Sequence, residues 1–229
     1  MTAITDSMDW QDMLALSFFL LSWIGYALVT DRETHLKNSL LAVMNGYRTQ
    51  WMHEMLHRDN RSVDVIMIGN LQRSITFFAN TSIFLLLGLM TMLSYHERAE
   101  SILAAVPFAK SSSPFLWEIK IFLLMIIFIY AFFKYTWSLR LYNYASIFVA
   151  AAPAHNERIG EHNSIAGKGS YLVGNAARHF NNGLRAYYFG LAALGWFLHP
   201  FLFMIATAIV VFVTHRREYR SKTLYMLAQ

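Results

Sequence analysis

Charged residues are missing from four long apolar stretches of the chain. These stretches run from Met13 to Val29, from Ser74 to Tyr95, from Ile121 to Phe133 and from Ala186 to Thr214. A membrane-crossing helix needs about twenty mostly apolar residues, because every backbone N–H and C=O must be paired inside the lipid. With their apolar flanks, the stretches predict an all-α integral membrane helical bundle with four transmembrane helices, at about residues 11–30, 72–95, 115–137 and 185–214.

The third predicted span belongs to a longer helix. No Pro or Gly occurs between Trp117 and Ala152, and Pro153 marks the end of the helix. Roughly 35 residues at about 1.5 Å each give a length of about 50 Å. We therefore expect this helix to project well beyond a hydrocarbon core of roughly 30 Å. Lys120 and Lys134 bracket the span, and both are expected to reach the headgroups.

The fourth stretch contains His199 and Pro200 near its middle. A proline removes one backbone hydrogen bond, so Pro200 predicts a kinked or tilted span. Two short re-entrant halves are the alternative, although about 14 residues in each half are too few to cross a bilayer.

The connections between the spans differ in character. In the first connection, apolar residues recur at spacings of three and four, at Leu36, Leu40, Met44, Tyr47, Trp51 and Met55. This spacing predicts an amphipathic helix at about residues 36–57, lying on the membrane or against the bundle. Residues 155–183 hold five glycines among polar residues, which predicts a polar loop that becomes helical again only toward the final span. Because the spans are spread along the chain, residues 1–229 are expected to form a single membrane domain.

The composition agrees with a lipid environment and restricts the chemistry. Of the 229 residues, 56% are hydrophobic and 14% are charged, whereas soluble proteins carry about a quarter charged residues. The absence of cysteine excludes disulfides, iron–sulfur clusters, thiolate zinc sites and cysteine nucleophiles. The net charge of +5 comes from basic residues that cluster beside the spans. Membrane lipids with anionic headgroups are therefore the expected partners, and nucleic acid is not.

Counts of Lys and Arg predict the orientation. The first and third connections hold twelve of these residues and the opposite side holds seven, and the richer side is expected to be cytoplasmic. Both termini are therefore predicted on the non-cytoplasmic side, in a membrane that we expect to be the bacterial inner membrane. The basic tail with Arg216, Arg217 and Arg220 opposes this orientation, and it would move to the cytoplasmic side if the last segment were re-entrant. The first twelve residues contain three Asp and no Lys or Arg, unlike a cleaved signal peptide. The first span is therefore expected to remain part of the mature protein.

One metal-binding pattern occurs in the first connection. His53, Glu54 and His57 match H-E-x-x-H, in which two histidines one helical turn apart bind zinc and the glutamate activates a water. A third ligand could come from another histidine, His35, His155 or His162. Zinc proteases usually continue with an uncharged residue, whereas Arg58 and Asp59 follow here. We therefore favour a solvated helix face, keep a zinc site at His53 and His57 as the alternative, and predict no cofactor.

The second predicted span carries small and polar residues. They are Ser74, Thr76, Asn80, Ser82 and Gly88. Polar side chains in hydrocarbon find hydrogen-bond partners on neighbouring helices, and small residues allow close approach. This set is therefore predicted to pack against other helices.

A group of arginines and one asparagine is predicted on the inner side of the membrane, next to aromatic residues. The group is Arg48, Arg73, Arg140, Asn143, Arg178 and Arg185. Arginines in this position can bind lipid phosphates, line an anion path or pair with acids of a neighbouring subunit. Positive-inside anchoring is the simpler alternative for each. Arg140 and Arg185 lie among uncharged residues of predicted helices, so these two are expected to need partners.

Five stretches together carry a distinctive pattern. They read RSITFFANT at residues 73–81, YTWSLRLYNY at 135–144, LRAYYF at 184–189, WFLHP at 196–200 and RREYRS at 216–221. This pattern resembles the domain of unknown function 599 family over nearly the whole chain. The family consists of uncharacterised multi-pass membrane proteins of bacteria and plants, so the resemblance implies an architecture and supplies no reaction. The family pattern near His53 and His57 includes no fixed zinc motif.

The favoured interpretation is a non-enzymatic membrane protein that forms a homo-oligomer or serves as an accessory subunit of a larger membrane complex. The spans hold few acids and few metal ligands, whereas the second span has a face suited to packing. One alternative is a small-anion channel or transporter that uses Arg73, Arg140 and Arg185. The other is a zinc-dependent membrane enzyme at His53, Glu54 and His57.

Overall fold

The computed structural model describes residues 8–30, 39–95, 98, 101, 113–154, 156–157 and 159–227. Seven α-helices are found there: α2 (Trp10–Thr30), α4 (Leu40–Leu56), α5 (Ser62–Leu93), α7 (Pro114–Ala150), α8 (His162–Leu194), α9 (Pro200–Tyr219) and α10 (Lys222–Leu227). Short 3-10 turns cover Ile159–Glu161 and Gly195–Phe197. The described chain is thus all-helical, as predicted.

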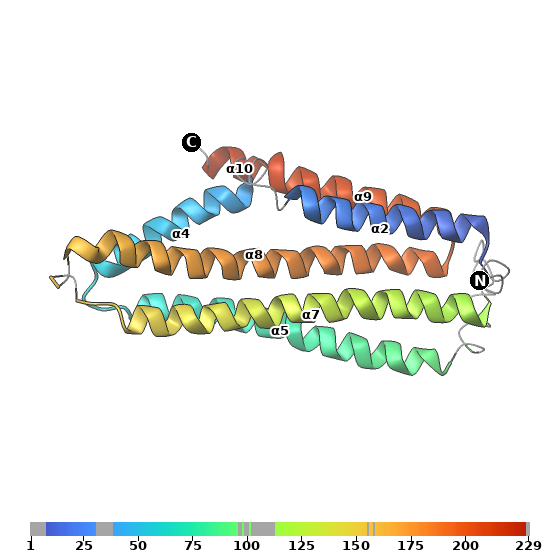
Figure 1. The fold of residues 1–229 in the computed structure, drawn as a ribbon, viewed down its shortest axis with the longest axis horizontal. Coiled ribbons are helices and arrows are strands. Elements are labelled where there is room, and N and C mark those ends of the chain that lie inside the picture. The colour runs from blue at the N-terminus through green and yellow to red at the C-terminus, as the bar shows by residue number, and fades with distance from the viewer. Residues whose placement is uncertain are drawn as a thin grey trace.

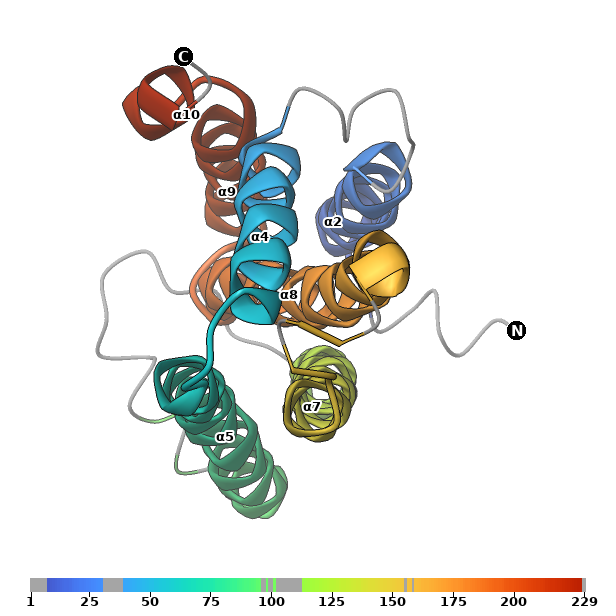
Figure 2. The ribbon, with the colours of Figure 1, turned by 90° about the vertical axis from the view of Figure 1, so that its left-hand side faces the viewer.

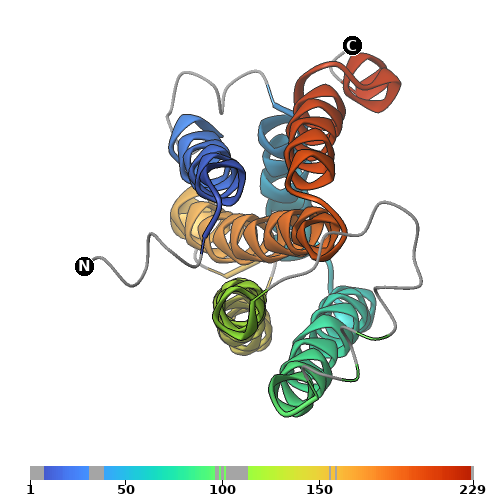
Figure 3. The same ribbon diagram turned by 90° about the vertical axis from the view of Figure 1, so that its right-hand side faces the viewer.

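The two longest helices form the centre of the molecule. Figure 1 shows α7 and α8 side by side along the long axis. Seen end-on, α5 lies on one side of this pair and α2 and α9 lie on the other (Figures 2 and 3). Helix α4 packs against the N-terminal half of α8, at the end of the bundle that α2 and α9 do not reach. The core therefore runs the length of the α7–α8 contact.

Four helical segments are long and apolar enough to cross a membrane. They are Trp10–Thr30, Ser62–Leu93, Pro114–Ala150 and Pro200–Leu227. This confirms the prediction of a multi-pass membrane bundle with four such helices. Helix α7 has 37 residues without interruption, as expected from the lack of Pro and Gly. Helix α5 starts ten residues before the predicted span at 72, so it also extends past the apolar stretch.

The prediction of one kinked span over residues 185–214 is wrong. Helix α8 ends at Leu194, the chain turns, and α9 starts at Pro200 and runs back in the opposite direction (Figure 1). His199 is extended, with φ −157° and ψ 138°, and its Nδ1 accepts a hydrogen bond from the backbone N–H of Phe201. A residue before proline prefers this extended conformation, and proline fits the first turn of a helix. Pro200 therefore starts a new helix and does not kink an existing one.

The prediction of a polar loop over residues 155–183 is also wrong beyond its first residues, because α8 begins at His162. Two of its glycines, Gly169 and Gly183, lie where side chains of neighbouring helices approach closely. A Cβ on Gly169 would come within 2.9 Å of the sulfur of Met52, and one on Gly183 within 2.5 Å of the Tyr135 ring. These glycines provide space for neighbouring helices rather than flexibility.

The helix predicted at 36–57 is confirmed as α4 (Leu40–Leu56), and residues 36–38 lie outside the described part of the chain. Ser39 caps its start by accepting a hydrogen bond from the backbone N–H of Ala42. Met52 and Met55 are fully buried, whereas Tyr47 is exposed. The helix lies against the bundle, on a face shifted slightly from the predicted stripe.

Gly183→Ala is expected to destabilise the protein by about 1–3 kcal/mol, the usual cost of overpacking. The added methyl would meet Tyr135, which is fully buried and packed between Phe78 and Phe180. Gly167→Ala in the same helix is the matched control, because nothing lies within 4 Å of its Cβ position. That variant should be neutral or more stable by up to about 1 kcal/mol. Thermal unfolding in mild detergent compares the two, and equal midpoints would contradict the close α7–α8 contact.

Candidate functional site

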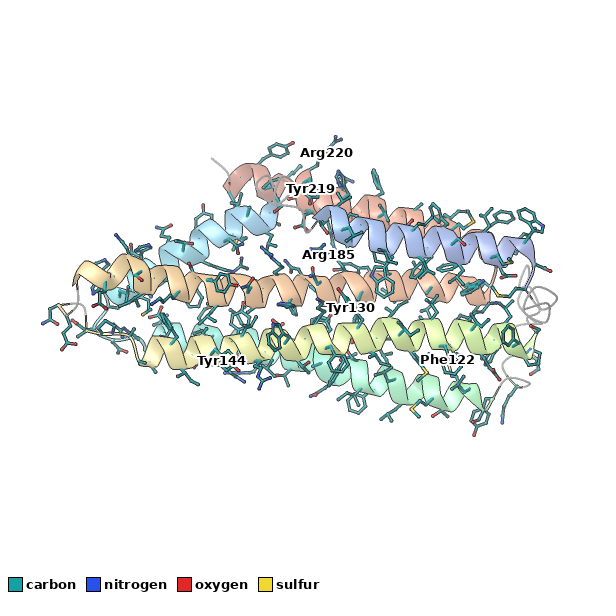
Figure 4. All side chains as sticks on the ribbon, viewed as in Figure 1. Phe122, Tyr130, Tyr144, Arg185, Tyr219 and Arg220 are labelled. Carbon is teal, nitrogen blue, oxygen red and sulfur yellow. The ribbon has the colours of Figure 1, made fainter. Side chains whose placement is uncertain are left out.

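Arg185 on α8 lies at the level where α2 ends. Its guanidinium donates a hydrogen bond to the hydroxyl of Thr30, the last residue of α2, and lies 5.9 Å from the centre of the Tyr26 ring. The Thr30 hydroxyl donates in turn to the Tyr26 carbonyl at 2.8 Å. In Figure 4, Arg185 lies on the side of α8 that faces α2 and α9. We expected Arg185 to need partners, and the residues that it contacts, Tyr26 and Thr30, lie on α2.

A cavity of about 310 Å³ opens next to Arg185, between α4, α8 and α9. Its charged lining residues are Arg48, Arg185, Arg217 and Glu218. Three guanidinium groups face one carboxylate, so the cavity carries net positive charge. Its remaining lining includes Asn181, Tyr188 and Thr214 as polar residues, and Leu40, Leu41, Met44 and Leu184 as apolar ones. A group that is anionic at one end and apolar at the other suits this lining.

Arg48 contributes to the cavity from α4. It donates a hydrogen bond to the side-chain oxygen of Asn45 at 2.8 Å. Burial lowers the pKa of the Arg48 guanidinium, and the nearby Tyr142 hydroxyl opposes this shift. A partly desolvated cation of this kind gains more from an anionic ligand than a fully solvated one does.

The six predicted inner-side residues do not form one cluster. Arg48 and Arg185 line the same cavity. Arg73 and Arg140 are exposed and belong to neither of the two cavities beside Arg185. Arg140 lies 5.9 Å from the centre of the Trp137 ring on its own helix. Asn143 accepts a hydrogen bond from Gln72 at 2.7 Å and so connects α7 to α5. Arg178 is half-buried, and its Nε has no hydrogen-bond partner within the described residues.

The predicted packing residues of α5 are divided between two environments. Ser82 is fully buried, and its hydroxyl lies 2.9 Å from that of Tyr187 on α8. The others are exposed on the surface of α5, namely Ser74, Thr76, Asn80 and Gly88. Within the described chain, only Ser82 therefore meets another helix as predicted.

The H-E-x-x-H residues lie on α4 and at its end. His57 packs against the ring of His162, with ring centres 5.8 Å apart. Nε2 of His162 makes a hydrogen bond with the Glu157 carbonyl at 2.9 Å. Among the described residues, no three His, Cys, Asp or Glu side chains are grouped so that they could hold a metal ion. His35 and His155, two of the possible third ligands, lie outside those residues.

Comparison with known proteins places this architecture in a family. The family described as "Protein of unknown function, DUF599" matches residues 14–223. The chain belongs to this family. No curated protein and no solved structure matches the chain.

Sequence reasoning missed a polar group at the α4–α5 turn of this DUF599 protein. Asp64 is buried and accepts hydrogen bonds from the Trp51 indole at 2.7 Å and from Arg58 at 2.6 Å. Arg61 donates to the carbonyls of Met55, Ala152 and Pro153, and so ties the end of α7 to this turn. A cation at the C-terminal end of a helix is favourable. The only sequence signal was an acid in the first turn of a helix, with arginines just before it.

A second missed group lies at the opposite end of the bundle. Asp12 is buried and accepts a hydrogen bond from the Trp196 indole at 2.7 Å. The Lys120 ammonium lies 5.7 Å from the centre of the Trp196 ring and 5.9 Å from that of Phe197. Lys120 is only 3% exposed, so the prediction that it reaches the headgroups is wrong. Neither residue could be paired with Trp196 before the α8–α9 turn was known.

Asp64→Ala is expected to destabilise the protein by about 1–3 kcal/mol, because it leaves the partly buried Trp51 N–H without its acceptor. Glu54→Ala is the matched control on α4, since Glu54 is exposed, and it should stay within about 0.5 kcal/mol of wild type. Denaturant or thermal unfolding in detergent measures both. A loss in Glu54→Ala equal to that in Asp64→Ala would contradict a specific role for the buried carboxylate.

Proposed function

We propose that this protein is a non-enzymatic membrane subunit that associates with a second copy of itself through the outward face of α5. The observation that carries the proposal is Asn80. It is exposed and makes no hydrogen bond to the part of the chain that the structure describes. Lipid offers an amide no hydrogen-bond partner, so a neighbouring helix is the natural place to find one.

The depth of Asn80 strengthens this argument. It lies seven residues after Arg73 and 13 residues before the end of α5 at Leu93, which is about 10 Å and about 20 Å along the helix. Its neighbours on the same face, Phe77 and Phe84, are 66% and 72% exposed. Asn80 is therefore surrounded by side chains suited to lipid, well inside the apolar layer.

A second copy of the chain fits this residue because an amide both donates and accepts hydrogen bonds. Around a two-fold axis the same face of α5 meets itself, so Asn80 of each copy can pair with its counterpart. Thr76, one turn away on the same face, can extend such a contact. An accessory role in a larger complex would use the same face with an unlike helix.

Cysteine cross-linking tests this interface directly, because the chain contains no cysteine. Asn80→Cys is expected to form a covalent dimer on mild oxidation in membranes. Phe122→Cys is the matched control, since Phe122 is 51% exposed and belongs to α7 rather than to the proposed α5 face. In detergent, Asn80→Leu should shift the protein toward monomer. The proposal would be overturned if the wild type stayed monomeric at all concentrations and Asn80→Cys formed no covalent dimer. Cross-linking of Asn80→Cys to a different protein would overturn the assignment of a second copy as the partner.

We also propose that α8 crosses the membrane, which makes five crossings and places the termini on opposite faces. Helices α2 and α9 run in the same direction along the bundle (Figure 1). With this topology the four basic residues of the tail join the twelve of the first and third connections, so that sixteen of the 19 Lys and Arg residues lie on one side and three on the other. This asymmetry favours a cytoplasmic C-terminus and a non-cytoplasmic N-terminus.

Labelling with a membrane-impermeant maleimide separates this topology from one with both termini outside. Trp10→Cys is expected to react in intact spheroplasts, whereas Tyr225→Cys should react only after the membrane is permeabilised. Both positions are well exposed, at 67% and 63%, so burial does not limit the reaction. Equal labelling of both variants in intact spheroplasts would contradict the five-crossing arrangement.

A further inference from the structure

We propose that the cavity between α4, α8 and α9 is a binding site for the phosphate of an anionic phospholipid headgroup. Arg48, Arg185 and Arg217 supply the positive charge, and Glu218 is the one acid among the lining residues. The site does not depend on association through α5, because α5 contributes none of its lining.

The donor chemistry suits a phosphate diester. Each guanidinium has five N–H donors in a planar fork. Arg48 and Arg185 each direct one terminal nitrogen at a neighbouring side chain, Asn45 and Thr30 respectively. These contacts hold the two arginines in place while leaving other donors of each guanidinium for an anion. Arginine binds phosphate oxygens in this bidentate way in many proteins.

The position of the cavity favours a lipid over a free anion. Arg185 touches Thr30 at the end of α2, and Arg217 and Glu218 belong to the last turn of α9. The apolar helices α2 and α9 both end at this level, which is where headgroups begin if these helices cross the bilayer. In Figure 4, Tyr219 and Arg220 lie at the same end of α9. A headgroup can therefore enter while its acyl chains stay in the membrane.

The apolar part of the lining also points to a lipid. Leu40, Leu41 and Met44 of α4 face the cavity together with Leu184 of α8. A free phosphate gains nothing from these side chains, whereas the glycerol and the first methylenes of a lipid can bury apolar surface against them. At about 310 Å³ the cavity is at the small end of the usual range for ligand sites, roughly 300–1,000 Å³, which fits a headgroup better than a whole lipid.

The test uses the full chain in a neutral detergent at fixed salt, titrated with dihexanoyl phosphatidylglycerol, dihexanoyl phosphatidylcholine or inorganic phosphate. Wild type should bind the phosphatidylglycerol about tenfold more tightly than either other probe. Arg48→Gln and Arg217→Gln should each raise its apparent Kd by about tenfold, and Glu218→Gln should lower it by removing the competing carboxylate. Arg217 is exposed, so its variant keeps the test usable if Arg48→Gln fails to fold.

Arg73→Gln is the matched control, because Arg73 is exposed and lies outside this cavity. Its Kd should stay within about twofold of wild type. An equal loss in Arg73→Gln would overturn the proposal in favour of unspecific surface charge. Inorganic phosphate binding as tightly as phosphatidylglycerol would overturn the lipid assignment. Failure of Asn80→Cys to cross-link would leave these results unchanged, so the two proposals can fail separately.

Discussion

The close contact between α7 and α8 is the constraint on which the rest of the bundle depends. Gly183 lies against the Tyr135 ring and Gly190 against Phe128, and the Ser138 hydroxyl donates to the Ala176 carbonyl at 2.6 Å. A side-chain hydroxyl reaches a backbone carbonyl of the facing helix only where small residues let the helices approach. The α7–α8 pair then offers two opposite faces, one covered by α5 and the other by α2, α4 and α9 (Figures 2 and 3).

Helices α2, α5 and α7 could be predicted from the sequence because each contains a long charge-free apolar run. Helix α8 could not, because its buried face consists largely of Gly and Ala, and other positions carry Arg178, Asn181 and Arg185. The mean hydropathy of such a helix is too low to predict a membrane span. Its glycine content is too high to predict an ordinary helix. Two of the glycines that suggested a loop, Gly183 and Gly169, are required by close contact with Tyr135 and Met52 respectively. The need for glycine at these positions could not be predicted, because Tyr135 and Met52 are far from them in the sequence.

The candidate site could be predicted only in part, for a related reason. Arg48 and Arg185 could be selected because an arginine next to apolar and aromatic residues needs an anionic or polar partner. Arg217 and Glu218 were read as part of a terminal tail, and only the reversal of the chain at His199 and Pro200 brings them beside Arg185. The buried Asp12 depends on the same turn, since its partner Trp196 lies within it. Both groups were therefore missed because Pro200 was interpreted as a kink within a span rather than as the start of a helix.

The reversal also links the charge distribution to the two surfaces for which we propose functions. The segment predicted as one crossing becomes the end of α8 and most of α9, so the basic end of α9 lies beside Arg48 and Arg185. The cavity opens at that level, on the α8 side of the central pair, whereas Asn80 faces away from the pair on α5. Because α7 and α8 separate them, a headgroup in the cavity and a neighbouring copy at α5 do not compete for space. The proposed lipid site and the proposed α5 interface can therefore be occupied at the same time.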